Sequence, residues 1–370
     1  MALSEPVNRR VAPVRRWRLL ALLVVAAVAV ALYVAGSMRG PGCSMEHGKG
    51  RTGGSDGAGM LTMSDGDLAR TLDAARDAGM WAVRVDVDWS RVEPVAGERD
   101  WSEVDRVMSA VIQHGMCPLG LVTYAPPWAA DPALRPTGNY FVPRDPQLFA
   151  DFAATAARRY RDRVMVWEVW NEPNTLKFFQ PRPDAAAYGR LLAATYVALK
   201  SVDAHIAVIS GGLAPAEDNG SDIAPTTFLS GLYAGDFNRY FDAFSIHPYS
   251  YPALPNGPGT EDWNTARRVG IMRDEMLAGG DGTKPIWITE CGAPTGTAAA
   301  AVSDAVQAQM LDIIMGYART TPWIGPAFVF SIRDGGRDAR DPEQNFGILR
   351  FDFSPKPAYG VVSEFGKAAI

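Results

Sequence analysis

The chain has 370 residues, of which 47% are hydrophobic and 21% charged, and its formal net charge is −5. This length is enough to bury a large core, and the composition is that of an ordinary globular protein. The mild acidity argues against a nucleic-acid partner, because phosphate binding needs a basic surface. We therefore expect no nucleic acid among the partners of this protein.

The N-terminal residues differ in kind from the rest of the chain. An apolar run, residues 19–36, follows a cluster of arginines and approaches the roughly 20 residues that a membrane-spanning helix needs. Arginines on its N-terminal side predict that residues 1–18 stay in the cytoplasm. A cleaved signal peptide is the alternative, although its apolar segment is usually about 7–15 residues long. We expect a single-pass transmembrane or signal-anchor helix in the cytoplasmic membrane, or a secreted protein if the segment is cleaved.

Residues 37–63 are rich in glycine and predict a linker that runs into an irregular first strand, placed around Gly42 to His47. Beyond residue 64, helical and strand-like patterns alternate to the end of the chain. The expected helices are 64–79, 101–114, 145–159, 184–203, 226–236, 260–278, 303–320 and 357–367. The expected further strands are 81–87, 117–124, 164–170, 207–210, 242–247, 285–290 and 326–331.

These strands are rich in Val, Ile, Phe and Trp on both faces, which is typical of a parallel sheet covered by helices. With the uncertain first strand there are eight strand–helix units, the rhythm of a (β/α)8 TIM barrel. An open doubly wound sheet is the alternative, but it usually carries a glycine-rich turn that opens a helix after its first strand. The glycine-rich stretch here opens no helix in that way. We therefore expect an α/β fold in which residues 64–370 form a single (β/α)8 catalytic domain.

Two glutamates stand where a buried strand gives way to a loop. Glu172 follows Trp170-Asn171 and precedes Pro173, and Glu290 closes the strand 285–290. Active sites of (β/α)8 barrels lie at the C-terminal ends of the strands, so both carboxylates are expected there. Two carboxylates at two strand ends are what cleavage of a glycosidic bond requires, one as proton donor and one as nucleophile or base.

The neighbours of each glutamate predict its charge state. Tryptophans and an asparagine around Glu172 make a half-apolar site, which favours the protonated carboxyl that a general acid needs. Glu290 must stay ionised to act as a nucleophile, and Arg84 and Tyr249 are candidates to stabilise its charge. Glu168 lies about 13 Å back along the strand from Glu172. We expect Glu168 to be a buried, paired structural carboxylate.

Several further motifs accompany the two glutamates, in order from the first helix to the last strand. They are residues 83–90 with Glu93-Pro94, Trp-Asn-Glu-Pro-Asn at 170–174, residues 211–215, His247-Pro248-Tyr249, Trp-Ile-Thr-Glu at 287–290, and residues 331–334. Together they resemble the retaining glycoside hydrolases of clan A, nearest to family 39 and the cellulase-like exopolysaccharide glycosidases.

This resemblance implies a role for each matched residue. Glu172 would be the acid/base and Glu290 the nucleophile, held ionised by the two partners named above. Asn171 would hydrogen-bond the sugar 2-hydroxyl, and His247 would line the subsite where the bond breaks. The carboxyls would lie about 5–5.5 Å apart, with retention of the anomeric configuration. No cofactor and no metal is implied.

Enzymes of this group usually carry a tryptophan at the end of the eighth strand as a floor for the sugar ring. Here the segment reads Phe328-Val329-Phe330-Ser331, so the floor is either Phe330 or missing. Aromatic residues in the predicted C-terminal loops could form an extended groove, which would favour endo cleavage of a polymer. We expect Tyr124, Trp128 and Phe179 to be among the substrate contacts.

The three cysteines are Cys43, Cys117 and Cys291. An odd number leaves at least one thiol unpaired, and the spacing fits no metal site. Cys291 directly follows Glu290, and we expect it to be a small buried filler.

The sequence therefore predicts a monomeric, membrane-anchored retaining β-glycoside hydrolase that acts on a cell-surface or extracellular polysaccharide. Two alternatives remain open. One is an inactive barrel that binds carbohydrate without turnover. The other is a transglycosylase that uses the same catalytic pair.

Overall fold

The computed structural model describes residues 43–44, 48–134 and 138–368. The expected basic tail and membrane helix, residues 1–36, lie outside these residues. Within the described part of the chain, no helix is both long enough and apolar enough to cross a membrane.

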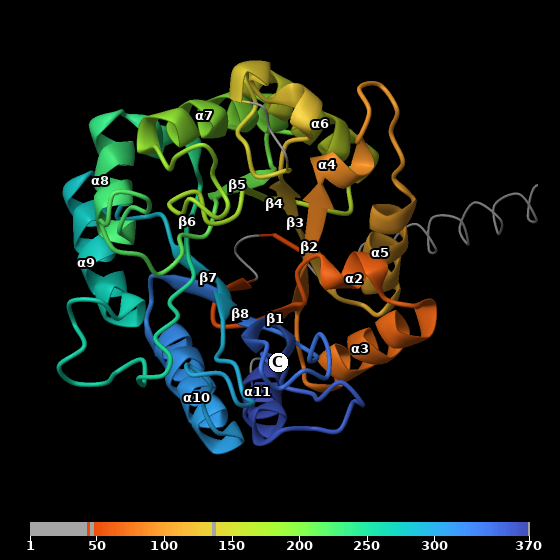
Figure 1. Cartoon of the computed structure of the whole chain (residues 1–370), viewed down its shortest axis with the longest axis vertical. Helices are drawn as coiled ribbons and strands as arrows, with labels where there is room; N and C mark the ends of the chain where they lie inside the picture. Colours follow the sequence, from red (N-terminus) through yellow and green to blue (C-terminus); the bar gives the residue numbers. More distant parts are fainter. Residues whose placement is uncertain (1–42, 45–47, 135–137, 369–370) are drawn as a thin grey trace, which may run out of the picture. The chain divides into compact units, whose positions relative to one another are not determined.

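Eight parallel strands form one sheet in the order β5-β4-β3-β2-β1-β8-β7-β6. They are β1 Thr52–Ser55, β2 Ala82–Asp88, β3 Cys117–Thr123, β4 Val166–Val169, β5 Ala207–Ser210, β6 Phe244–Ile246, β7 Ile286–Cys291 and β8 Ile324–Phe330. Parallel bridges Ile209–Ala243 and Leu213–Ile246 join β5 to β6, so the sheet nearly closes into a barrel. The strands lie at the centre of Figure 1, with the helices around them. The expected (β/α)8 architecture is confirmed for the described residues.

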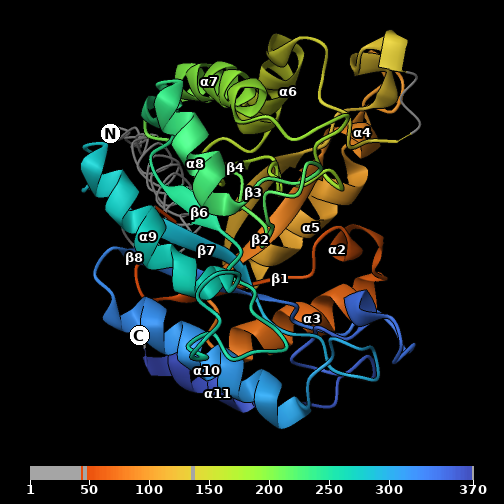
Figure 2. The same cartoon turned by 60° about the vertical axis from the view of Figure 1, so that its left-hand side comes forward.

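The larger helices cover the outside of this sheet, as the two views show (Figures 1 and 2). The helices are α2 Gly59–Thr62, α3 Asp65–Asp77, α4 Trp89–Val92, α5 Ser102–Gln113, α6 Pro146–Arg159, α7 Ala185–Val202, α8 Pro225–Ala234, α9 Thr265–Ala278, α10 Asp304–Thr320 and α11 Pro357–Ala368. Several begin at a side-chain cap: Ser64, Asp145, Asp184 and Ser303 each accept a hydrogen bond from a backbone N–H of the first turn. Such caps satisfy donors that the helix leaves free, which is why these starts were predictable from sequence.

Strand β1 lies later in the chain than expected. It spans Thr52–Ser55, whereas we placed it around residues 42–47, of which the structure describes only 43 and 44. Two glycines fill its centre because no side chain fits there. A Cβ on Gly53 would lie 2.4 Å from the ring of Phe328, and one on Gly54 would lie 2.7 Å from Ile332. Apart from Thr52, the strand therefore carries none of the β-branched or aromatic residues by which strands are recognised.

The barrel interior is apolar in its N-terminal half and polar in its C-terminal half. The apolar cluster comprises Trp81, Ala82, Cys117, Leu119, Val166, Ala207, Ile209, Ala243, Trp287 and Phe328. Arg84 and Glu168 lie two residues beyond Ala82 and Val166 on β2 and β4, on the same face, and form a buried ion pair. Because alternate side chains of a strand face inward, the inward positions are apolar near the start of the strands and charged near their C-terminal ends. Active sites of such barrels lie at those C-terminal ends.

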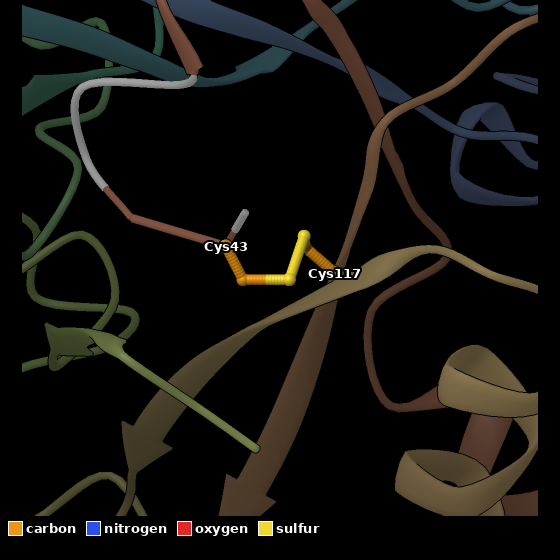
Figure 3. Close-up of a disulfide and its surroundings, with 2 residues drawn as sticks. All are labelled: Cys43 and Cys117. Carbon is orange, nitrogen blue, oxygen red and sulfur yellow. A yellow bond between two sulfur atoms is a disulfide. The ribbon is translucent and has the colours of Figure 1, made fainter. Parts of the chain in front are cut away.

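A disulfide joins Cys43 to Cys117 at the start of β3 (Figure 3). Cys43 also packs against the apolar cluster inside the barrel. Cys291 is the free thiol that the odd count required, and it is buried as expected. Its Sγ lies 3.3 Å from the carbonyl oxygen of Phe328, to which it donates.

Replacing Cys117 with serine is expected to lower the free energy of unfolding by about 2–4 kcal/mol. The bond closes a loop between residues 74 positions apart, and its loss frees that loop in the unfolded chain. Urea titration of the variant and of the oxidised wild type measures the difference. Reductant should bring the wild-type midpoint to that of the variant, and identical midpoints without reductant would contradict a stabilising role.

Candidate active site

A cavity of about 780 Å³ opens at the C-terminal ends of the strands, a size typical of small-molecule sites. Seven of the ten site residues expected from sequence line it: Arg84, Tyr124, Asn171, Glu172, Tyr249, Glu290 and Phe330. An eighth, His247, is fully buried and contacts Glu172. The remaining two, Trp128 and Phe179, are not among its lining residues.

Glu290 is held as a carboxylate by two hydrogen-bond donors, one of which is a cation. Arg84 Nη1 donates to its Oε1 at 2.6 Å, and the hydroxyl of Tyr249 donates to its Oε2 at 2.8 Å. Burial disfavours the charge, but His247 and Arg84 together with these hydrogen bonds outweigh it and lower the pKa of Glu290. This is the state that a nucleophile or base requires.

An irregularity in β7 brings Glu290 into the barrel. Thr289 already points inward, since its hydroxyl donates to Glu168 at 3.0 Å. In a regular strand the next side chain would point outward. The pairing of β7 with β8 shifts register between Ile288 and Cys291, and such bulges redirect a side chain at functional sites. As a result both Thr289 and Glu290 contact the interior network.

Arg84 is the centre of that network. It is 1% exposed, and its Nε and Nη2 donate to the two carboxylate oxygens of Glu168 at 2.6 and 3.1 Å. Glu168 is fully buried and also accepts from the backbone N–H of Gly212. It is therefore the paired, buried carboxylate expected from sequence. The pair fixes the guanidinium so that its remaining nitrogen reaches Glu290.

Asn171 is oriented by the same guanidinium. Arg84 Nη2 lies 2.9 Å from the side-chain oxygen of Asn171. Because arginine only donates hydrogen bonds, this contact assigns the oxygen to Arg84. The Asn171 NH₂ group can then donate to the Tyr124 hydroxyl and to a ligand in the cavity. A sugar hydroxyl placed there would find a donor, as the resemblance implies.

Glu172 projects from a strained turn after β4. Trp170 and Glu172 both have left-handed backbone angles, with φ of 71° and 48°, a conformation that costs about 1–3 kcal/mol for such residues. Gly211 and Gly212 pack against this turn. A Cβ on Gly211 would lie 2.6 Å from the carbonyl oxygen of Trp170, and one on Gly212 would lie 2.2 Å from His247. The glycine pair therefore permits the close approach that positions Glu172.

The carboxyl of Glu172 has a different neighbour from the one expected. We expected flanking tryptophans to form its surroundings, but Trp170 packs against Phe149 and Phe179 and its Nε1 donates to the carbonyl of Phe178. The hydrogen-bond partner of Glu172 is instead His247, whose Nδ1 lies 3.0 Å from Oε1. The sequence motif correctly singled out Glu172, but the conformation of the turn determines that His247, and not a tryptophan, contacts its carboxyl.

The hydrogen bonds around His247 place a proton between it and Glu172. Thr289 has one hydroxyl hydrogen, which it donates to Glu168, so it accepts from Nε2–H of His247 at 3.1 Å. The other ring nitrogen, Nδ1, faces Glu172 at 3.0 Å and Glu290 at 3.6 Å. Burial disfavours the imidazolium, but the charges of Glu290 and Glu172 outweigh this and raise the pKa of His247. The pair thus stores one proton beside the second carboxylate.

Aromatic side chains form two walls of the cavity. Tyr124 stacks on Phe178, and Tyr140 packs edge-on against both. On the other side lie Tyr249, Tyr251, Phe330 and Phe346, which pack against one another. Phe330 occupies the end of β8 and lines the cavity, so a smaller ring stands where the resemblance implies a tryptophan.

Trp128 and Phe179 were expected to contact substrate, and the structure places both elsewhere. Trp128 packs edge-on against Trp89 at 5.3 Å, and its Nε1 donates to the carbonyl of Glu93. Phe179 is 1% exposed and packs between Trp170 and Tyr188. Both therefore serve the packing of loops onto the barrel.

Several lining residues were not singled out from the sequence: Asp86, Lys177, Gln180, Asp222, Glu343 and Phe346. Most come from loops whose path no motif reveals. Asp86 is the exception, because it shares strand parity with Arg84, and that signal in the sequence could have placed it on the inner face.

One group of described residues offers three metal-type ligand atoms within 4.8 Å of one another, namely Glu172, His247 and Glu290. Glu172 and His247 already hydrogen-bond each other, and Arg84 and Tyr249 occupy the oxygens of Glu290. A cation at this place would have to compete with the guanidinium of Arg84. The arrangement fits proton transfer and nucleophilic attack better than metal binding.

Replacing Tyr249 with phenylalanine is expected to move the acidic limb of the kcat/KM profile to higher pH. The variant loses a hydrogen bond that lowers the pKa of Glu290, so this carboxyl protonates and loses function earlier as the pH falls. We also expect kcat/KM at neutral pH to fall roughly 10-fold, the value of one hydrogen bond to a charged group. An unchanged acidic limb would show that Tyr249 does not act through Glu290.

No protein-family model matches the chain. Parts of it are similar to two curated proteins. A glucoside beta-D-glucosidase of Triticum aestivum is 30% identical over 124 residues, covering 32% of this chain and 21% of that protein. A beta-xylosidase of Geobacillus stearothermophilus is 33% identical over 123 residues, covering 31% of this chain and 23% of that protein. The chain thus matches less than a quarter of the length of either relative.

Solved structures match most of the chain. A family 39 glycoside hydrolase from Bacteroides cellulosilyticus WH2 has a TM-score of 0.70 at 27% identity, covering 88% of this chain and 65% of that one. A monomeric beta-xylosidase from Caulobacter crescentus CB15 has a TM-score of 0.64 at 19% identity, covering 85% and 67%. The second likeness shows the fold alone. The resemblance to clan A glycoside hydrolases of the family 39 group, expected from the motifs, is confirmed.

Proposed function

We propose that this protein is a retaining β-glycoside hydrolase in which Glu290 is the nucleophile and Glu172 the acid/base. The observation that carries this proposal is the spacing of the two carboxylates, an oxygen of each lying within 4.8 Å of the other. Retaining enzymes hold their carboxyls about 5–5.5 Å apart, whereas inverting enzymes leave about 6.5–9.5 Å for a water molecule. The glycosidases among the similar proteins support the same reaction class.

In the first step, Glu290 attacks the anomeric carbon and forms a covalent ester while the bond to the leaving oxygen breaks. The proton held between Glu172 and His247 passes to that oxygen, so the leaving group departs as an alcohol. In the second step, Glu172 takes a proton from water, and the hydroxide oxygen attacks the anomeric carbon. This releases the sugar and restores the carboxylate of Glu290.

The charges around the two glutamates support this division of roles. Arg84 and the Tyr249 hydroxyl stabilise negative charge on Glu290. Burial and the charge of Glu290 raise the pKa of Tyr249 well above its usual value, so it stays a donor. Glu172 has no cation other than His247 within ion-pair distance among the described residues. One carboxyl is thereby kept ionised, and the other shares a proton.

The reaction class is tested by incubating the full chain with a panel of 4-nitrophenyl β-glycosides and β-linked glycans. Release of nitrophenol or new reducing ends is the expected result. Tight binding of a glycan without cleavage would instead favour the inactive barrel. Products longer than the substrate would show transfer to sugar rather than to water.

We further propose that the substrate is a polysaccharide cut internally. Aromatic walls on two sides of the cavity, around Tyr124 and around Tyr251, support binding of several sugar units, since sugar rings stack on such side chains. The size of early products tests this point. A spread of oligosaccharide lengths at low conversion is expected, and monosaccharide alone would show exo action.

We also propose that residues 19–36 anchor a monomer to the cytoplasmic membrane with the barrel outside. The apolar run and its flanking arginines support this, and the Cys43–Cys117 disulfide suits an oxidising compartment. Membrane fractions of expressing cells should retain the full-length chain after a carbonate wash, and external protease should degrade the barrel. Recovery of the uncleaved chain in the soluble fraction would contradict the anchor.

A further inference from the structure

One acidic side chain in the cavity has a buried oxygen without a hydrogen-bond partner among the described residues. Asp86 lies on β2, one pleat, about 7 Å, beyond Arg84 on the same face. It lines the cavity and is only 7% exposed. Its Oδ1 is buried and accepts no hydrogen bond from any described residue. Buried polar atoms nearly always have a partner, so an orphan beside a substrate cavity points to a ligand that supplies one.

The free protein is destabilised by this arrangement. Burial raises the pKa of Asp86 to about 7, although the charge of Arg84 opposes the shift. The neighbouring Asp88 differs, because its carboxylate accepts from the backbone N–H and the hydroxyl of Ser90. Asp88 caps helix α4 and is not among the cavity-lining residues. On β2, Asp88 therefore has a structural role as a helix cap, whereas no described residue gives the buried Oδ1 of Asp86 such a role.

The charges around the cavity decide what ligand Asp86 can meet. Two cations and five acids line it: Arg84 and Lys177, and Asp86, Glu172, Asp222, Glu290 and Glu343. Arg84 is engaged by Glu168 and Glu290, and Lys177 lies 3.8 Å from Glu343. Arg84 is thus fully engaged, whereas Lys177 is exposed and only loosely paired. Because five acids face two cations among the described lining residues, the cavity disfavours a carboxylate on the substrate.

We propose that Asp86 is a specificity-determining residue that accepts hydrogen bonds from ring hydroxyls of the sugar attacked by Glu290, so that the site takes neutral sugars and rejects uronic acids. This rests on the proposed glycosidase function. Asn171 and Asp86 both lie beside Arg84. Asn171 accepts a hydrogen bond from it, and Asp86 lies two residues further along β2. If Asn171 serves the 2-hydroxyl, Asp86 serves the hydroxyls that follow it around the ring, at C3 and C4.

The first test compares Asp86→Asn with Asp88→Asn on the 4-nitrophenyl β-glycoside that the wild type cleaves fastest. Asp86→Asn should lower kcat/KM about 10- to 100-fold, the range for a lost hydrogen bond to a charged group, and Asp88→Asn should stay within about 3-fold. Equal effects, or none, would overturn the proposal.

Thermal unfolding at pH 8 separates a binding role from a structural one. A carboxyl whose pKa is raised in the folded state costs stability as the pH rises from its unfolded value of 3.8 through about 7. Removing the charge should therefore leave the Tm of Asp86→Asn at or above that of the wild type. Asp88→Ala, which removes the side-chain oxygen that caps α4, should unfold at a lower temperature. A Tm for Asp86→Asn well below wild type would indicate a structural role and overturn the proposal.

Monodeoxy substrates test the contact directly. The 3-deoxy or 4-deoxy analogue should be cleaved about 10- to 100-fold less efficiently by the wild type, with little further loss in Asp86→Asn. If the deoxy substrate and the Asp86→Asn substitution each lowered kcat/KM by their full factor when combined, the assignment would be overturned. The wild type should also cleave β-glucosides or β-galactosides at least about 100-fold better than the matching uronides, and equal rates would overturn the exclusion of uronic acids.

The outcomes separate this proposal from the function on which it rests. Wild-type turnover that Glu290→Gln abolishes and Asp86→Asn leaves unchanged would overturn only the role of Asp86. No turnover of any glycoside by the wild type would overturn both.

Discussion

Replacing Glu290 with glutamine is expected to lower kcat by at least about 10⁴-fold, as loss of a catalytic nucleophile does in other enzymes. An amide of the same shape cannot form the covalent ester with the anomeric carbon. The amide oxygen can still accept from Arg84, and the amide NH₂ group can donate to the hydroxyl oxygen of Tyr249. The cavity should therefore keep its shape and its affinity for sugar. Steady-state kinetics and calorimetric titration with a non-hydrolysed glycan measure the two effects separately.

The matched control for this variant is Glu217→Gln, a change at an exposed glutamate that pairs with Arg268. It removes one carboxylate from the same barrel and should leave kcat unchanged. Near-native turnover by Glu290→Gln would show that another group attacks the sugar. Equal losses in both variants would point to a general effect on folding.

Replacing Glu172 with glutamine is expected to produce a loss that depends on the leaving group. Natural glycosidic oxygens leave poorly without a proton, so their cleavage should slow about 10²- to 10⁴-fold, the usual contribution of a general acid. Aryl glycosides with acidic phenols need no such help in the first step. Their ester with Glu290 should form at a nearly normal rate and then accumulate, because no base activates water.

A series of aryl β-glycosides with phenols of graded acidity checks this expectation. The rate of the first step should depend steeply on phenol acidity in Glu172→Gln and weakly in the wild type. Azide, which attacks without a base, should restore turnover of the accumulated ester. A uniform loss across all leaving groups would contradict the acid/base role.

Much of the fold could be predicted because its signals are local. Helices α3 and α6 begin at side-chain caps, and most strands are short apolar runs. Strand β1 was misplaced for the opposite reason. Its glycines are required by Phe328 and Ile332, residues that approach only once the barrel has closed. Because these glycines are required by contacts distant in sequence, the segment has no strand-like residue pattern from which β1 could be predicted.

The site residues likewise fall into those that local sequence could place and those that it could not. Arg84 on β2, Glu290 on β7 and Asn171 just after β4 come together at one end of the barrel, as the sequence predicted. Trp128 and Phe179 follow the strands in loops, where sequence does not show which way a ring turns. The proton shared by His247 and Glu172 likewise depends on the hydroxyl of Thr289, a contact between β6 and β7 that no motif encodes.

The most direct test of the central claim is the anomeric form of the first product, followed by proton NMR as the wild type cleaves a β-linked substrate. The spacing of Glu172 and Glu290 predicts that the β-anomer appears first and converts to the α-anomer only by mutarotation. Initial release of the α-anomer would contradict the account, because it would show a single displacement by water without a covalent intermediate on Glu290.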